Sequence, residues 1–262
     1  MNIFYTDKQQ IINWLDKHEV KNYILIADEK YGFIVNVTGD VDLSNKELIN
    51  IHVKFGEITG NFLCNSNQLT SLEFSPQTVD GGFYCGKNKL ISLEFCPQSV
   101  SGDFYCSNNQ LTSLEFSPQA VDGGFYCENN QLTSLEFSPQ AVDGGFYCGN
   151  NQLTSLEFSP QTVSGDFYCS NNQLTSLEFS PQTVGRSFYC ENNRLTSLEF
   201  CPQTVGEKFY CSSNPELKEI QKITNFNLIY LEHKKILATN LSDKLSNDLI
   251  NDNSKRTARI KI

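Results

Sequence analysis

Eight cysteines recur at intervals of 21 residues, and thiols at a fixed spacing could bind metal or form disulfides. Structural zinc needs four ligands that converge on one point, whereas these thiols would form a line without histidine. Thiols on neighbouring paired strands would have parallel Cβ directions, which is poor disulfide geometry. We therefore expect reduced thiols buried in a core, with no metal site and no cofactor. The column comprises Cys64, Cys85, Cys106, Cys127, Cys148, Cys169, Cys190 and Cys211.

A tyrosine precedes seven of these cysteines and follows a phenylalanine. Strand alternation that points Phe and Cys inward points the tyrosine outward, so the sequence predicts an aromatic stripe. Such a stripe indicates a contact surface, rich in a residue type common at interface hot spots. The alternative is that the rings pack on one another and shield the sheet. The stripe comprises Tyr84, Tyr105, Tyr126, Tyr147, Tyr168, Tyr189 and Tyr210, with Glu128 and Glu191 on one flank.

The last two complete repeats break the pattern with charged residues. Arg186, Glu191, Arg194 and Lys208 could form a mixed-charge patch beside the last tyrosines of the stripe. A uniform lattice distinguishes partners poorly, whereas a non-repeating end can supply specificity. The alternative is sequence drift near a terminal cap.

Catalysis has little support in the sequence. No Gly-x-Ser-x-Gly, Walker loop or His-Glu-x-x-His motif occurs, and His18, His52 and His233 are scattered along the chain. A glutamate also recurs in every repeat, and we interpret this column as a solvated acidic row, because hard cations need several converging oxygens. We expect a protein that is not an enzyme.

The repeat unit is VDGGFYCENNQLTSLEFSPQA, which runs from Val121 to Ala141. Its segment F-x-C-x-x-N-x-L-T-S-L resembles the leucine-rich repeat signature L-x-L-x-x-N-x-L. The short period and the proline are similar to the short bacterial subtype, and such repeats also occur in phage proteins. The resemblance covers about residues 40–219. It implies a parallel β-sheet on a concave face that usually binds protein.

The physics of a short repeat agrees with this resemblance. A coil of 21 residues cannot bury its own apolar face, so coils must stack. Phe125 and Cys127 would point into the core, with Leu132, Leu135 and Phe137 lining the remainder. An asparagine three residues after each cysteine could satisfy buried backbone groups where the chain turns. The proline and the few helix-forming residues predict an extended or polyproline II convex side.

The ends of the chain predict caps. Residues 1–39 should form an α/β cap, with a capping box from Thr6, a helix and two strands near 22–27 and 32–37. Residues 40–219 should form about eight and a half coils of a β-solenoid. Residues 220–262 should form a helical C-terminal cap followed by a basic tail.

The net charge and the hydropathy of the chain limit which kinds of partner it can have. The 262 residues carry 20 Lys and Arg against 30 Asp and Glu, a net charge of -10, and the repeats from Cys64 to Cys211 hold all of it. This balance disfavours nucleic acid and favours a protein partner with a basic or repetitive surface. Neither a membrane span nor a classical signal peptide is evident, so we expect a cytoplasmic monomer. Two alternatives to a protein-interaction scaffold stay open: a glycan-binding module, and a host-directed effector exported without a classical signal.

Overall fold

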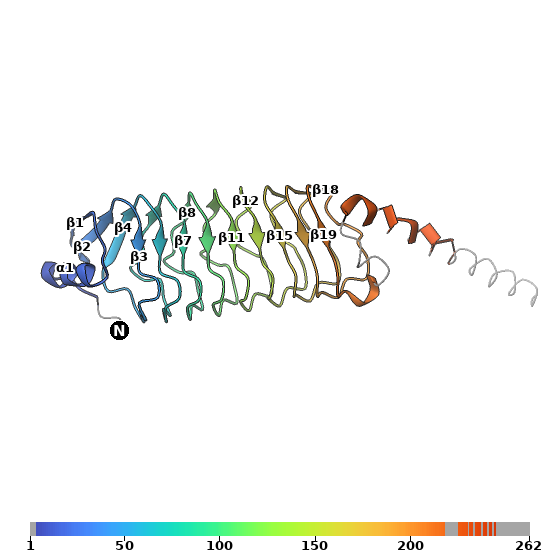
Figure 1. The fold of residues 1–262 in the computed structure, drawn as a ribbon. Coiled ribbons are helices and arrows are strands. Elements are labelled where there is room, and N and C mark those ends of the chain that lie inside the picture. Colours follow the sequence, from blue (N-terminus) through green and yellow to red (C-terminus); the bar gives the residue numbers. More distant parts are fainter. Residues whose placement is uncertain are drawn as a thin grey trace, which may run out of the picture.

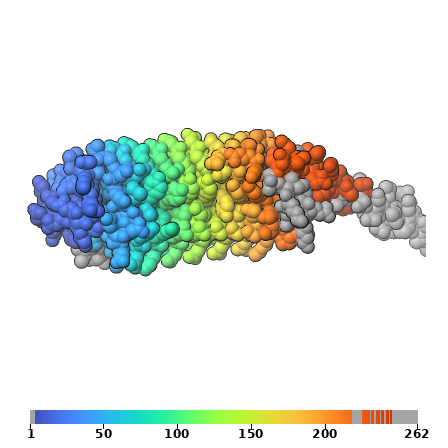
Figure 2. Space-filling view, in the orientation of Figure 1, coloured from blue at the N-terminus to red at the C-terminus, as the bar shows by residue number. Residues whose placement is uncertain are grey.

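The protein is an almost straight rod of stacked coils (Figure 1). The computed structural model describes residues 4–217 and, within 225–244, all residues except 230, 233, 237, 240 and 243. Each coil advances the chain by 21 residues, so successive repeats lie side by side in sequence order (Figure 2). The coils stack because each one covers the apolar edge of the coil before it.

One long side of the rod is a parallel sheet, here called the Tyr sheet. Neighbouring strands pair one repeat apart, as in Phe125 with Phe146 and Tyr126 with Tyr147. In the described part of the chain this sheet has nine strands. Their order is β19 (Phe209–Tyr210), β17 (Phe188–Tyr189), β15 (Phe167–Tyr168), β13 (Phe146–Tyr147), β11 (Phe125–Tyr126), β9 (Phe104–Tyr105), β7 (Phe83–Tyr84), β5 (Phe62–Leu63) and β3 (Val41–Asp42).

The return side of each coil is extended, as expected, but it also pairs into parallel sheets, here called the Val side. In most coils a buried valine alternates with an exposed small residue, as in Val121 and Ala120, whereas Val205 in the last coil is half-buried. The first sheet contains β1 (Tyr23–Asp28), β2 (Gly32–Val37), β4 (Lys54–Ile58), β6 (Thr78–Val79), β8 (Ser99–Val100), β10 (Ala120–Val121) and β12 (Ala141–Val142). The second contains β14 (Thr162–Val163), β16 (Thr183–Val184) and β18 (Thr204–Val205).

The core is built from columns of identical residues. The inward phenylalanines are fully buried and stack coil upon coil, and the rings of Phe125 and Phe146 have centroids 5.4 Å apart. The predicted burial of the cysteine column is confirmed, and all these thiols are free. Burial raises the pKa of each column thiol, because a thiolate would be desolvated there. Of the two cysteines outside the column, Cys96 is buried and Cys201 is half-buried.

The asparagine column satisfies buried backbone groups, as the sequence predicts. Asn130 Nδ2 donates to the carbonyl oxygens of Cys127, at 3.1 Å, and of Cys106 in the preceding coil, also at 3.1 Å. Its Oδ1 accepts from the backbone N–H of Leu111 at 3.1 Å. Each amide therefore ties two coils together where both leave the Tyr sheet.

The prediction that Phe137 lines the core is wrong. Leu135 is buried, but the chain then makes a tight turn closed by a bond of 2.9 Å from Ser138 N–H to Leu135 O. Phe137 occupies the third position of this turn with φ of 68°, and its side chain is 48% exposed. The turn reverses the chain towards the Val side, so the ring cannot follow Leu135 inward.

An α/β cap covers the first coil. Helix α1 (Lys8–Lys17) begins after Asp7, whose carboxylate accepts from the backbone N–H groups of Gln9 and Gln10, so Asp7 is the N-cap residue and the predicted Thr6 is not. The helix buries Trp14 against the first core phenylalanine, Phe55. Strands β1 and β2 are antiparallel, and β2 continues into the first sheet of the Val side through β4.

The described residues beyond the last coil begin to close the other end. After η1 (Pro215–Leu217), Lys208 and Asn225 form an antiparallel bridge. Residues 226–229 are helical, and Phe226 packs on the last core phenylalanine, Phe209, at 5.7 Å. Residues 218–224 and 245–262, which include the predicted basic tail, lie outside the described residues.

Candidate functional site

The tyrosine column forms a stacked ladder on the outer face of the Tyr sheet. Tyr105 and Tyr126 have ring centroids 3.7 Å apart and planes 8° apart, and Tyr126 and Tyr147 follow at 4.5 Å and 7°. Every tyrosine of the column is half-buried. The rings therefore do pack across strands, but part of each side chain remains accessible to a partner.

Glycines determine which way the rings lean. A Cβ atom at Gly124 or Gly145 would lie within 3 Å of the ring of Tyr126 or Tyr147, so each ring occupies the space that a side chain would fill. The ring of Tyr168 lies instead over Gly149, in the preceding coil. The stacking is therefore wider between Tyr147 and Tyr168, whose ring centroids are 6.4 Å apart and whose ring planes are 30° apart.

A shallow hollow of about 380 Å³ opens beside the ladder at its N-terminal end. Tyr84 and Tyr105 form one wall, Glu128 contributes a carboxylate, and Gly86 and Ser107 leave the space empty because they are small. Burial raises the pKa of Glu128, and its Oε2 atom is buried without a hydrogen-bond partner. Burial also raises the pKa of Tyr105, so its hydroxyl stays protonated and can donate. The hollow thus combines ring edges, a hydroxyl and an acidic group.

The charged residues of the last coils lie on both flanks of the ladder. Arg186 pairs with Glu207 at 3.3 Å and lies 3.9 Å from Asp166, which in turn accepts from the hydroxyl of Tyr147 at 3.2 Å. On the opposite flank, Glu191 accepts from the hydroxyl of Ser212 at 2.7 Å.

The other two residues of the predicted patch are separated from these pairs. Lys208 directly precedes β19, on the same flank as Arg186, and its backbone N–H donates to Ser187 Oγ. Arg194 is exposed in the turn beyond the asparagine column, and its backbone N–H donates to the carbonyl oxygen of Leu174. Through Asp166, Arg186 therefore lies beside the tyrosine ladder, which we call the Tyr face together with its flanking residues, whereas Glu191 lies on the opposite flank and Arg194 in a separate turn.

A second aromatic surface was missed by the sequence reasoning. The residues equivalent to Phe137 in six successive coils are 44–56% exposed, and all have φ between 65° and 71°. An exposed glutamate precedes each of them in the turn. We call this surface the Phe–Glu ridge: Phe95, Phe116, Phe137, Phe158, Phe179 and Phe200, with Glu94, Glu115, Glu136, Glu157, Glu178 and Glu199. The glutamate column was recognised in the sequence, but only the turn geometry shows that its phenylalanine neighbours face outward.

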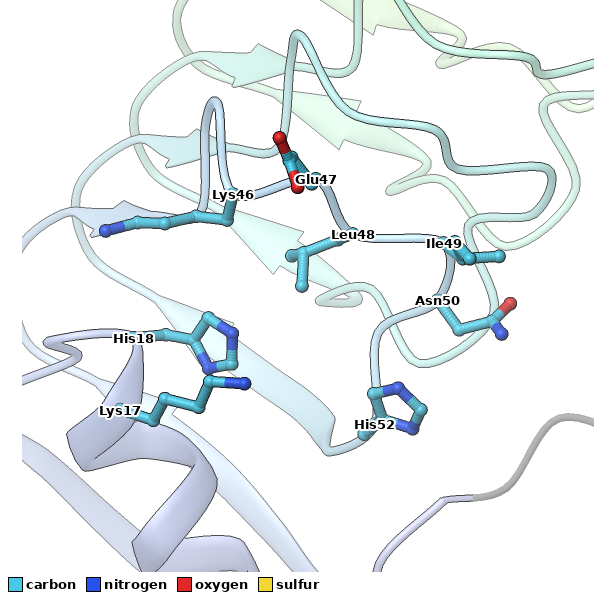
Figure 3. Close-up of a pocket in the computed structure, with 8 residues that line it drawn as sticks. All are labelled: Lys17, His18, Lys46, Glu47, Leu48, Ile49, Asn50 and His52. Carbon is cyan, nitrogen blue, oxygen red and sulfur yellow. The ribbon is translucent and has the colours of Figure 1, made fainter.

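A basic hollow of about 350 Å³ lies between the cap and the first coil (Figure 3). It brings together His18, at the end of α1, and His52, which the sequence reasoning treated as scattered. His18 Nδ1 lies 2.7 Å from Trp14 O and its ring packs on Trp14, while burial lowers its pKa. His52 stacks on Tyr5 at 5.4 Å. The contact of His52 with Tyr5 fastens the cap to the solenoid, whereas the contacts of His18 with Trp14 lie within the cap. His233 lies outside the described residues.

The described residues contain neither a metal site nor a membrane-spanning helix. Within the described ranges, no cluster of His, Cys, Asp and Glu side chains could hold a metal ion. Among the helical residues that the structure describes, no segment has the length and apolar character required to cross a bilayer.

Parallel one-repeat pairing, a buried asparagine ladder and buried leucine columns together define a solenoid of the leucine-rich repeat type. The comparison of folds agrees: the chain is similar to YopM from Yersinia enterocolitica WA-314, with a TM-score of 0.51 and 22% sequence identity. The match covers 66% of this chain and 37% of YopM, so this chain spans well under half of that protein. The chain matches no protein-family model and no curated protein.

Proposed function

We propose that this protein is a non-enzymatic interaction scaffold that binds a protein partner along the Tyr face. The observation that carries the proposal is the half-buried tyrosine ladder with its adjoining acidic hollow. Stacked rings form a rigid surface, so binding costs little side-chain entropy, and aromatic residues of this kind are enriched at hot spots. Near-identical coils also offer repeated weak sites, which favour an extended or repetitive partner through effective concentration.

The charge of the Tyr face favours a basic partner. Glu128, Glu191 and Asp166 lie along the ladder, while Arg186 is already paired with acidic neighbours. Complementary charge mainly accelerates encounter and fixes orientation. A basic side chain that enters the hollow beside Tyr105 would meet the buried carboxylate of Glu128, which has one oxygen without a partner.

Stacking weakens the case for glycan binding. Sugars contact aromatic residues through the faces of the rings, but the faces in Tyr105, Tyr126 and Tyr147 are occupied by one another. What remains accessible is the ring edge and the hydroxyl, which suits hydrogen bonding to a protein surface. Protein is therefore the better-supported ligand class.

Affinity capture from a lysate with matched variants tests this proposal. The double variant Tyr105→Ala and Tyr126→Ala should lose captured proteins that the unchanged chain retains. The control is Thr162→Ala with Thr183→Ala on the Val side, where the equivalent position already holds Ala120. Equal capture by both variants would remove the Tyr face as the binding surface. Saccharide binding on a glycan array, lost in the Tyr variant and unaccompanied by any captured protein, would favour the glycan alternative.

A further inference from the structure

The Phe–Glu ridge combines backbone strain with exposed apolar surface. Hydrogen bonds from the preceding coil hold turns such as those of Phe137, Phe179 and Phe200, but these bonds do not require a phenylalanine there. A bulky residue in the left-handed region costs about 1–2 kcal/mol, and turns of this type favour glycine at the third position. About half of each ring gains nothing from burial, since Phe116, Phe137 and Phe158 are 44%, 48% and 46% exposed. The chain nevertheless places phenylalanine at this position in every one of these coils. Such strain persists only where the surrounding structure holds it, and it clusters at functional sites.

Phe74, the first member of the phenylalanine column, shows what covers such a side chain. Phe74 occupies the same turn position with φ of 74°, yet it is only 4% exposed. Its ring packs on Phe4, with centroids 4.9 Å apart and planes 37° apart, and lies edge-on to Tyr31 at 6.0 Å. Two aromatic side chains from the N-terminal cap thus bury the first member of the phenylalanine column.

A basic residue accompanies these aromatic rings. Lys30 Nζ lies 4.8 Å from the centroid of the Tyr31 ring. The pKa of Lys30 is raised, first by its interaction with Tyr31 and further by the carboxylates of Asp28 and Glu73. Glu73 is the glutamate that precedes Phe74. At Phe74, aromatic side chains of the cap therefore cover the ring, and the ammonium group of Lys30 lies over one of them, Tyr31.

We propose that the Phe–Glu ridge is a second docking surface, which binds a segment of another protein that presents aromatic and basic side chains. The cap supplies the intramolecular template for this contact at Phe74, and the ridge repeats the same surface six times along the rod. Aromatic side chains bury the exposed ring faces, and lysine or arginine pairs with the glutamate row. A second copy of this chain is a poor occupant of the ridge, because two glutamate rows would repel each other.

Fluorescence anisotropy with a labelled peptide of alternating lysine and tyrosine tests this proposal on the full chain. The triple variant Phe116→Gly, Phe137→Gly and Phe158→Gly should weaken peptide binding at least about tenfold. A matched triple variant, with Glu115, Glu136 and Glu157 each changed to Gln, should also weaken binding and reduce its salt dependence. The variant Gln131→Ala with Gln152→Ala, at exposed positions outside both the ridge and the tyrosine ladder, should bind the peptide as the unchanged chain does.

Two controls make the result decisive. Glycine adopts the left-handed region freely, so the Phe variant should keep the circular dichroism spectrum of the unchanged chain. A peptide with serine in place of tyrosine should bind at least about tenfold more weakly, because its charge alone cannot bury the rings. The proposal is overturned if the two peptides bind equally, if neither binds, or if the Phe variant retains full affinity. Concentration-dependent self-association that only the Phe variant abolishes would assign the ridge to a second copy and would also overturn it.

Discussion

The hydroxyl of Ser159 donates a hydrogen bond of 2.7 Å to the carbonyl oxygen of Phe179, one coil further along the chain. The same bond joins Ser117 to Phe137 at 2.7 Å and Ser180 to Phe200 at 2.9 Å. The strained turns from Phe116 to Phe200 are therefore held from the coil before them, whereas Ser75 Oγ makes no such bond to Phe95. This ladder explains how a bulky residue can occupy a left-handed position in coil after coil.

The serine ladder predicts a graded response at Ser159. Ser159→Ala should lower the free energy of unfolding by about 1–2 kcal/mol, because the Phe179 carbonyl loses its donor. Ser159→Cys should cost less, since Cys96 occupies the equivalent position and its thiol lies 3.0 Å from Phe116 O. Urea denaturation measures both, with the exposed Thr154→Ala as a control. A loss for Ser159→Cys that equals the loss for Ser159→Ala would contradict this account.

The asparagine ladder should be the most sensitive polar feature of the solenoid. Asn130→Ala leaves the Cys106 and Cys127 carbonyls and the Leu111 N–H without their amide partner, and should cost about 3 kcal/mol. The neighbouring Gln131 is exposed, so Gln131→Ala should change stability by less than about 0.5 kcal/mol. Equal denaturation midpoints for the two variants would show that the amide does not couple the coils.

The strained turn predicts an unusual order of stability at Phe137. Phe137→Ala loses the half-buried ring but keeps a side chain in the left-handed region, whereas Phe137→Gly loses the ring and relieves the strain. The glycine variant should therefore be about 1 kcal/mol more stable than the alanine variant, the reverse of the order in a helix. Thermal unfolding measures the difference. Leu135→Ala, which empties part of the core, should cost about 2–5 kcal/mol and serves as the reference.

The buried thiols predict a loss of stability at alkaline pH. Burial raises the pKa of Cys106, Cys127 and Cys169 well above the ordinary value, whereas the same thiols ionise near pH 9 in the unfolded chain. Above that pH the unfolded state binds fewer protons than the folded state, so stability falls as pH rises towards the folded pKa. Each thiol contributes a slope of about 1.4 kcal/mol per pH unit.

Urea unfolding at about pH 8 and about pH 10 measures this slope. The variant Cys127→Val with Cys148→Val removes two titrating groups, so its stability should depend less steeply on pH than that of the unchanged chain. A slope that is identical in the two proteins would mean that the column thiols do not govern alkaline unfolding.

The sequence by itself determined the elements that depend on periodicity. A period of 21 residues sets the one-repeat register, as in the pairing of Phe125 with Phe146. Strand alternation then places Cys127 inside and Tyr126 outside, and a repeated amide such as Asn130 finds buried backbone groups at each turn. These features are local or lie between adjacent identical repeats, so the pattern of residue types was sufficient to predict them.

Only the tertiary structure decided features that depend on backbone direction or on contacts between distant segments. The turn after Leu135 sends Phe137 outward because its φ is positive, which hydrophobicity alone does not reveal. The ring of Tyr168 leans differently from that of Tyr147 because a glycine of the preceding coil leaves space for it. Phe74 is buried while its equivalents are exposed because Phe4 folds back onto it. Identical repeats thus acquire different surroundings, and these differences distinguish the surfaces available for binding.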